Sequence, residues 1–218
     1  MSKGPAKIII EGIEYTNSKS IALALSEYPQ FVGPKEDHRF TTVISAKWGN
    51  FRDFPWGKGL IDFAPSEEKQ VMKKYGTWAH LIELQGYYNW IIDRFHISAQ
   101  CYQKQCNDHV CEFKWLEERF LKLGFHLVHV TQNSEAIERA IENQKIDNSK
   151  NRLEQIIKEQ DLLRTIASKS ILPKIELDIS EMGVQEAVEN ITDWYEEVYS
   201  YTEVDNPETD KIFLPSCS

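Results

Sequence analysis

The chain has 218 residues, of which 41% are hydrophobic, and it carries a formal net charge of -9. This length suits one α/β domain with a full core, and no apolar run approaches the ~20 residues that span a bilayer. The acidic charge weighs against a DNA or RNA partner, because phosphate neutralisation needs a basic surface, but it permits small phosphorylated metabolites. The first residues, Met1–Pro5, lack the apolar centre of a signal peptide, so we expect a cytoplasmic protein with no membrane partner.

The first predicted strand, Lys7–Glu11, leads through Gly12 and a polar loop into a predicted helix, Ile21–Glu27. This layout is typical of a phosphate-binding loop, in which backbone N–H groups at a helix N-terminus face an anion and a lysine reaches over it. The P-loop pattern is G-x-x-x-x-G-K-S/T. Counted from Gly12, Lys19 comes one residue late, and Ser18 stands where a glycine should precede the lysine.

Despite these changes, we expect this loop to bind a nucleotide phosphate through Gly12, Asn17, Ser18, Lys19 and Ser20. Glycines in a P-loop allow positive φ and a close approach of the backbone to phosphate, and none follows Gly12 here. Asparagine tolerates the left-handed region, so Asn17 is expected to replace part of that function. Reduced nucleotide affinity, a changed donor and loss of catalysis would all fit the altered loop.

Further apolar runs and helical spacings alternate along the chain. Buried strands are predicted at Gln30–Val32, Asn89–Asp93, Phe125–Thr131 and Lys174–Asp178. Helices are predicted at Glu67–Tyr87, Cys111–Leu123, Ser134–Asn143, Arg152–Ser168 and Val184–Val198. This alternation favours a three-layer α/β domain with a five-stranded parallel sheet flanked by helices. Ligands bind at the carboxyl ends of such strands, so the Gly12 loop and Asp93-Arg94 should share one crevice.

Two segments stand apart from this alternation. Residues 33–66 mix glycine, proline and charge with aromatic residues that include Trp48. This aromatic-rich excursion either packs on the edge of the domain or forms a wall for a flat ring such as a nucleobase. Residues 200–218 are expected to form a C-terminal tail.

Three of the four cysteines lie close together in the sequence. Cys101, Cys106 and Cys111 form with His109 the pattern C-x4-C-x2-H-x-C, which can be interpreted as a set of zinc ligands. The short C-x2-C knuckle of structural zinc sites is absent, and free thiols in a reducing cytosol are the other interpretation. The sequence leaves both open.

Residues 91–103 read Ile-Ile-Asp-Arg-Phe-His-Ile-Ser-Ala-Gln-Cys-Tyr-Gln. This stretch resembles the D-R-Y/F-x-x-S-x-x-A-Y-Q signature of thymidylate kinases, with Cys101 in place of the alanine. The resemblance extends in the same order over residues 6 to about 198 and includes Glu138-Arg139, where these kinases begin the lid that covers the phosphates. It implies that residues 1–218 form a single domain with the fold of thymidylate and deoxynucleoside kinases, with a lid-like segment at 139–152.

The resemblance also implies a role for individual residues. Lys19 would contact the β and γ phosphates of the ATP donor, and Ser20 and Asp93 would serve Mg²⁺. Arg94 would clamp the phosphate of the acceptor or the one being transferred, which makes Lys19, Asp93 and Arg94 the catalytic set. Lid cations would come from Arg139 and Arg152, with Lys145 and Lys150 as further ones, and acceptor contacts would come from Arg94, Ser98, Tyr102, Gln103 and Trp48.

Each of these residues has a structural interpretation as well. Lys19 and Ser20 can simply begin a helix, Asp93-Arg94 can be an ion pair at the end of the sheet, and the lid cations can lie on a solvated helix face.

The sequence therefore favours a kinase that transfers a phosphoryl group from a nucleoside triphosphate to a nucleoside, deoxynucleoside or nucleoside monophosphate, with a pyrimidine base preferred. One alternative is a catalytically impaired, kinase-like protein that binds a nucleotide or a protein partner. Another is a kinase that acts on modified bases in DNA, although the acidic charge opposes it. Relatives of this fold are often dimers, so a homodimer stays open.

Overall fold

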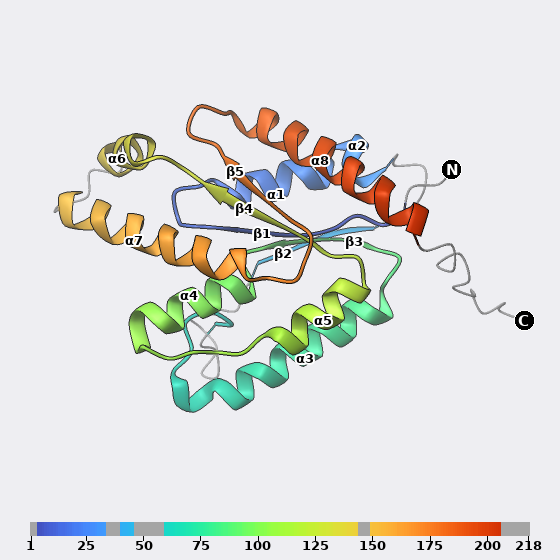
Figure 1. The fold of residues 1–218 in the computed structure, drawn as a ribbon, viewed down its shortest axis with the longest axis horizontal. Coiled ribbons are helices and arrows are strands. Elements are labelled where there is room, and N and C mark those ends of the chain that lie inside the picture. Colours follow the sequence, from blue (N-terminus) through green and yellow to red (C-terminus); the bar gives the residue numbers. More distant parts are fainter. Residues whose placement is uncertain (1–3, 34–39, 46–58, 144–148, 206–218) are drawn as a thin grey trace, which may run out of the picture.

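Five parallel strands form the centre of the molecule, in the order β2-β3-β1-β4-β5 (Figure 1). Their bounds are Lys7–Gly12 for β1, Thr41–Ser45 for β2, Asn89–Asp93 for β3, His126–Thr131 for β4 and Lys174–Asp178 for β5. The computed structural model that shows them describes residues 4–33, 40–45, 59–143 and 149–205. Every neighbouring pair of strands is parallel, so all five carboxyl ends lie on one edge of the sheet.

Helices cover both faces of this sheet. Their bounds are Ser18–Glu27 for α1, Pro29–Val32 for α2, Pro65–Glu67 for the 3-10 turn η3, Glu68–Leu84 for α3, His96–Asn107 for α4, Lys114–Lys122 for α5, Ser134–Asn143 for α6, Ser149–Ser168 for α7 and Val184–Asp205 for α8. None of the described helices is long and apolar enough to cross a membrane. The predicted three-layer arrangement of a five-stranded parallel sheet is confirmed.

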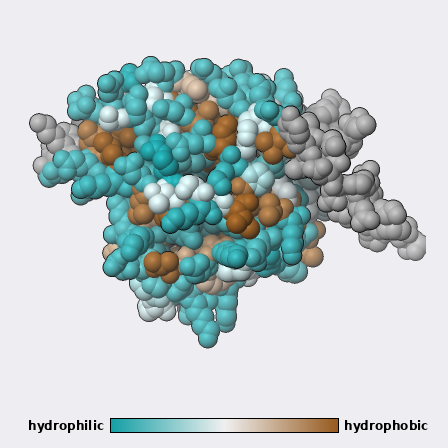
Figure 2. Space-filling view, viewed as in Figure 1, coloured by the Kyte–Doolittle hydropathy of each residue, from teal (hydrophilic) through white to brown (hydrophobic). Residues whose placement is uncertain are grey.

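The alternation of side chains along β1 creates two cores. Ile8 and Ile10 point to one face and pack with residues of α1 and α8, whereas Ile9 points to the other face, toward α3, α4 and α5. Figure 1 shows α1 and α8 on one side of the sheet and α3, α4 and α5 on the other. On the side shown in Figure 2, hydrophilic residues cover most of the surface and separate small apolar patches.

The second predicted strand is wrong. Gln30–Val32 lies in α2, which begins at Pro29 and buries Phe31 against the core that α1 and α8 share. Proline favours the first position of a helix, and its fixed φ starts this short turn. The missing strand is β2, Thr41–Ser45, inside the segment predicted as an irregular excursion. Its residues are only half buried at the edge of the sheet, so no continuous apolar run marks it.

Several predicted boundaries also move. α1 begins at Ser18 rather than Ile21, and α5 begins at Lys114 rather than Cys111. The last helix continues to Asp205, so the predicted tail does not begin at residue 200. α4 is not among the predicted helices at all, although the D-R signature runs directly into it.

Two histidines of β4, His126 and His129, are buried. His126 Nδ1 donates to the Gly124 carbonyl at 3.0 Å and the ring packs against Tyr195, while His129 lies 3.3 Å from Glu176. The Nε2 atoms of both rings are buried without a partner. Burial lowers the pKa of both side chains, because a proton on Nε2 would place a charge in the core with no acceptor.

These histidines predict that the protein loses stability in mild acid. Below a pH of about 6.5, these histidines bind protons in the unfolded chain but not in the folded chain, so the free energy of unfolding falls. The fall ends once the pH is below the lowered pKa that the histidines have in the folded chain. Urea unfolding at pH 7.5 and 5.5 measures the loss. The variant His126→Asn, which keeps a donor for Gly124 but does not titrate, should lose about 1 kcal/mol less than the parent. Equal losses in the two proteins would contradict this account.

Candidate functional site

The carboxylate of Glu11, near the end of β1, lies at the N-terminus of α4 and is fully buried. It accepts hydrogen bonds from the backbone N–H groups of Phe95 at 2.9 Å, Ile97 at 3.1 Å and Ser98 at 3.2 Å, and from the Ser98 hydroxyl. The N-cap residue itself, Phe95, supplies no side-chain hydrogen bond. Glu11 therefore caps α4 from another element and fixes it to the centre of the sheet.

Two opposing effects act on this carboxyl group. Burial raises the pKa of Glu11, whereas the charges of His96 and Arg94 and the hydrogen bonds from Ser98 and Phe95 lower it. The net direction is upward.

The loop between β1 and α1 forms a tight turn. Thr16 donates its backbone N–H at 3.2 Å and its hydroxyl at 2.8 Å to the Ile13 carbonyl. A Cβ atom at residue 12 would lie 2.3 Å from Thr16 Oγ1, so this turn needs the glycine that stands there, Gly12. Asn17 then takes a left-handed conformation, with φ of 52°, and is the N-cap of α1. The expectation that Asn17 adopts a conformation typical of glycine is confirmed.

The side chain of Asp93, the last residue of β3, is held from two sides. Ser18 Oγ donates to Asp93 Oδ1 at 2.7 Å, and Ser45 Oγ, at the end of β2, donates to Oδ2 at 3.1 Å. Ser18 and Asp93 are both buried, whereas Lys19 and Ser20 are exposed. The hydroxyl that bonds to the carboxylate is therefore that of Ser18, two residues before Ser20, the residue to which the sequence assigns the metal.

The same corner offers donors to an anion. Ile21 is the first residue of α1 whose N–H reaches a backbone carbonyl, that of Asn17 at 3.0 Å. Within the described part of the chain, the N–H groups of Ser18, Lys19 and Ser20 have no acceptor, as expected for the first turn of a helix. These groups, with the positive end of the helix dipole, favour a phosphate at this position.

Arg94 is buried beside the same strand end and has a positive φ of 56°. Its Nε donates to Ser98 Oγ at 3.2 Å, and its NH2 group lies 3.6 Å from Glu159 of α7. Asp93 and Arg94 therefore do not form an ion pair with each other. Asp93 accepts hydrogen bonds from two serine hydroxyls, whereas Arg94 contacts Glu159 of α7, on the same side of the sheet as α4.

Two of the predicted lid cations, Arg139 and Arg152, are also paired with acids. Arg152 of α7 lies 3.1 Å from Glu14 of the phosphate-loop segment and bonds to the side chain of Tyr15. Arg139 of α6 lies 3.3 Å from Glu181. The predicted lid-like segment at 139–152 consists of the end of α6 and the start of α7, and residues 144–148, with Lys145, lie outside the described residues.

An apolar contact joins these helices to the loop. Ile13 and Tyr15 are buried together with Ile137 and Ile141 of α6 and Ile156 of α7. α6 and α7 therefore pack directly on the residues between Gly12 and Asn17 rather than standing away from them.

The predicted acceptor residues differ in their surroundings. The hydroxyl of Ser98 donates to Glu11 and accepts from Arg94. Gln103 is buried and donates its amide to the carbonyls of Ile61 at 3.0 Å and Phe63 at 2.8 Å, so it holds the chain that precedes α3. Tyr102 is exposed, and Trp48 lies outside the described residues.

Sequence reasoning missed four residues of this site. Glu11 holds Ser98, and Glu14 holds Arg152. Ser45 holds Asp93, and Glu159 holds Arg94. Only Glu11 had a recognisable signal, because an acid at the end of a fully apolar strand needs partners in the core. The others come from a half-buried edge strand, a loop and a helix surface, where a single serine or glutamate is ordinary.

No family of known proteins and no curated protein matches the sequence. Solved structures do match the fold of this chain. The YorR protein from Bacillus subtilis, in complex with phosphorylated GDP, has a TM-score of 0.62 at 19% identity and covers 89% of this chain and 98% of its own. A gluconokinase from Sinorhizobium meliloti 1021 has a TM-score of 0.51 at 11% identity, with coverage of 94% and 99%. A shikimate kinase from Bacteroides thetaiotaomicron has a TM-score of 0.50 at 9% identity, with coverage of 88% and 98%. These likenesses show that the chain has a P-loop kinase-type fold.

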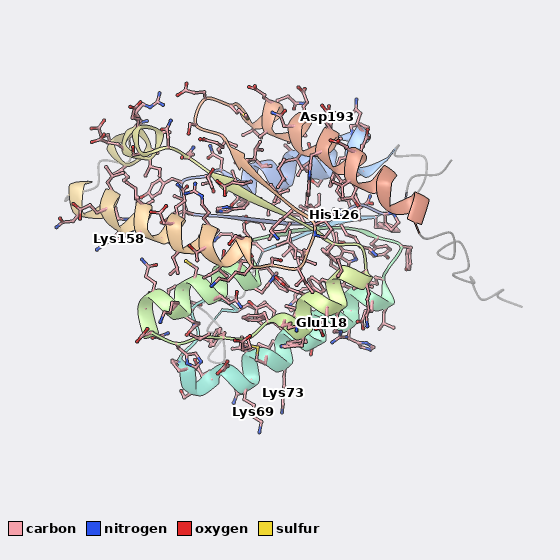
Figure 3. The ribbon with its side chains drawn as sticks, in the orientation of Figure 1. Lys69, Lys73, Glu118, His126, Lys158 and Asp193 are labelled. Atoms are coloured by element: carbon pink, nitrogen blue, oxygen red, sulfur yellow. The ribbon has the colours of Figure 1, made fainter. Side chains whose placement is uncertain are left out.

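Replacing Glu11 should destabilise the protein more than replacing any exposed glutamate. Glu11→Ala leaves the buried N–H groups of Phe95, Ile97 and Ser98 without their acceptor, at a cost of about 3 kcal/mol in the free energy of unfolding. Glu118→Ala on the outer face of α5 (Figure 3) is the control and should change that energy by less than about 0.5 kcal/mol. Urea unfolding compares the two. Similar effects would show that α4 does not depend on this cap.

Proposed function

We propose that the protein is a Mg²⁺-dependent phosphotransferase that takes a phosphoryl group from a nucleoside triphosphate. The observation that carries this proposal is the Ser18–Asp93 pair at the N-terminus of α1. P-loop enzymes hold Mg²⁺ with a loop serine or threonine and an aspartate at the end of a neighbouring strand, and hard oxygen ligands suit this ion. Here β1 and β3 are adjacent strands, and the pair lies beside the free N–H groups of α1.

The chemistry needs little beyond position and charge. Phosphoryl transfer depends on neutralising negative charge and on holding donor and acceptor in line. The backbone donors of α1 would hold the β phosphate, the amine of exposed Lys19 would reach the γ phosphate, and Ser18 and Asp93 would hold the metal. Arg94 would turn from Glu159 to the transferred group. When bound, Mg²⁺ would neutralise charge on the phosphate oxygens.

We propose a nucleoside, deoxynucleoside or nucleoside monophosphate as acceptor, with a pyrimidine base preferred. The D-R signature at Asp93-Arg94 supports this choice through its resemblance to thymidylate kinases. The phosphorylated GDP bound to the structurally similar YorR protein supports a nucleotide ligand in general. Assembly as a homodimer and a cytoplasmic location belong to the same proposal.

A second candidate is a catalytically impaired protein that keeps a nucleotide or partner site. Two observations favour it. In a P-loop, the lysine directly follows the last glycine of the loop. Here the residue in the left-handed conformation is Asn17, and the residue that follows it is Ser18 rather than a lysine. Tyr15 fills the space between the loop and α6 and α7 with an aromatic ring.

Removing the Lys19 amine should abolish most transfer and leave the fold intact. Lys19→Ala is expected to lower turnover with ATP·Mg²⁺ at least 100-fold, because one charge that acts on the transition state is worth that much. Lys73→Ala, on the outer face of α3 (Figure 3), is the matched control. The measurement is transfer of labelled phosphate from ATP to a panel of nucleosides and nucleoside monophosphates. Unchanged turnover in Lys19→Ala would remove this residue from the mechanism.

Ser18 and Ser20 can be separated by calorimetry. Ser18→Ala should weaken Mg²⁺-dependent ATP binding about tenfold or more, because it removes a hydroxyl that meets Asp93, whereas Ser20→Ala should have a smaller effect. Titration of ATP with and without Mg²⁺ measures both. A larger loss in Ser20→Ala would restore the assignment made from sequence. Absence of binding by the parent protein with any metal would favour the impaired alternative, as would binding without transfer.

A further inference from the structure

Glu68, His109 and Cys111 form a cluster of metal-ligating side chains far along the chain from the phosphate loop. A carboxylate oxygen of Glu68, a ring nitrogen of His109 and the sulfur of Cys111 all lie within 4.8 Å of one another. His109 Nε2 is 2.9 Å from Glu68 Oε2. Glu68 begins α3, whereas the other two lie between α4 and α5, so the fold and not the sequence spacing brings them together.

Main-chain hydrogen bonds fix this arrangement. Asp108 ends α4 in a left-handed conformation, and His109 donates its backbone N–H to the Gln103 carbonyl at 3.0 Å. Gln100 donates its amide to the Cys111 carbonyl at 3.0 Å. Gln103 also holds the segment that leads into α3, as described above. His109 and Cys111 are thus positioned by α4, which also holds the segment that leads to Glu68.

We propose that Glu68, His109 and Cys111 bind a zinc ion, with water as the fourth ligand. Thiolate, imidazole and carboxylate together suit Zn²⁺, which binds four such donors in a tetrahedron. Bond lengths of about 2.0 to 2.3 Å place ligand atoms about 3.3 to 3.7 Å apart, so small side-chain rotations complete the site from the spacing present. Cys111 is buried, and the Glu68 and His109 side chains are 32% and 31% exposed, which leaves one side of the site open to water.

This set corrects the zinc pattern read from the sequence. Cys101 is buried, and its sulfur lies 3.5 Å from the Glu159 carbonyl of α7, while Cys106 is exposed. Neither belongs to the cluster of Glu68, His109 and Cys111. The glutamate that replaces them comes from another helix, and no spacing rule in the sequence points to it.

Metal binding requires that the thiol lose its proton. Without metal, burial and the nearby Glu68 carboxylate raise the pKa of Cys111 to about 12, so the thiol is protonated. When Zn²⁺ binds, the S–H bond breaks, the proton leaves to solvent, and the sulfur donates its electron pair to the metal. A bound ion would join the start of α3 to the α4–α5 connection as a structural clip.

Cobalt provides a test in the full-length protein. Co²⁺ is added alone at pH 8, and a near-ultraviolet charge-transfer band from sulfur to cobalt is expected to saturate at one ion per chain. Zn²⁺ should displace the cobalt, whereas a large excess of Mg²⁺ should not, because Mg²⁺ prefers oxygen ligands. Cobalt bound at Ser18 and Asp93 has only oxygen ligands and gives no such band, so the result does not depend on the proposed phosphotransfer.

The cysteines supply a matched pair of variants. Cys111→Ser should lose the band, and Cys106→Ser, five residues earlier on the exposed end of α4, should keep it. If Cys111→Ser does not fold, Glu68→Gln and His109→Gln should each weaken cobalt binding at least tenfold while the band keeps its position. The proposal is overturned if the parent protein shows no band, if Cys111→Ser keeps it, or if both partial variants bind as tightly as the parent.

Discussion

A buried carboxylate connects the two halves of the candidate site. Glu11 belongs to β1, which continues into the loop before α1. Its carboxylate accepts hydrogen bonds from the first N–H groups of α4, the helix that follows Asp93 and Arg94. A buried carboxylate without hydrogen-bond donors is costly, so Glu11 and the first N–H groups of α4 fix each other's position. The distance between the start of α1 and the start of α4 is therefore set in the core, before any ligand binds.

The backbone at Arg94 shows what this constraint costs. A long side chain seldom adopts a positive φ, and such strain costs about 1 kcal/mol or more. The left-handed turn at Arg94 redirects the chain from β3 so that the N–H groups that follow point at Glu11. The same turn leaves Asp93 on the side of Ser18 and Arg94 on the side of α7. The turn that Glu11 caps thus separates the carboxylate of Asp93 from the guanidinium of Arg94, its neighbour in sequence.

The sequence predicts best the elements whose apolar pattern is clear. β3 matches its predicted bounds because it is an apolar run that is buried throughout, and α6 does so because its inner stripe repeats with the helical period. β5 also matches its predicted bounds, but the expectation that it is buried is wrong, because at the edge of the sheet only Leu177 is buried. β2 lies at the sheet edge and carries no such run, while Pro29 directs its expected position into a helix. At the site, the sequence points to Asp93 and to the Ser18 segment, which the fold brings together, but not to Glu11, Glu14, Ser45 and Glu159. Those contacts depend on rotamers and on side chains from distant elements, which no local pattern encodes.

The arginines around the loop are paired with acids, which bears on the proposed phosphate site. Arg152 and Arg94 lie beside Glu14 and Glu159, so their charges are already compensated. Exposed ion pairs are worth less than about 1 kcal/mol, and exchanging a carboxylate for a doubly charged phosphate therefore costs the Arg152 pair little. Arg94 is more buried, and its exchange requires Glu159 to move into solvent, which its position on the surface of α7 allows. Tyr15 differs from these charged groups, because it is buried in an apolar cluster with α6 and α7. Under the proposed function, binding of a nucleotide at the N–H groups of α1 would therefore depend on the packing of α6 and α7 as well as on these ion pairs.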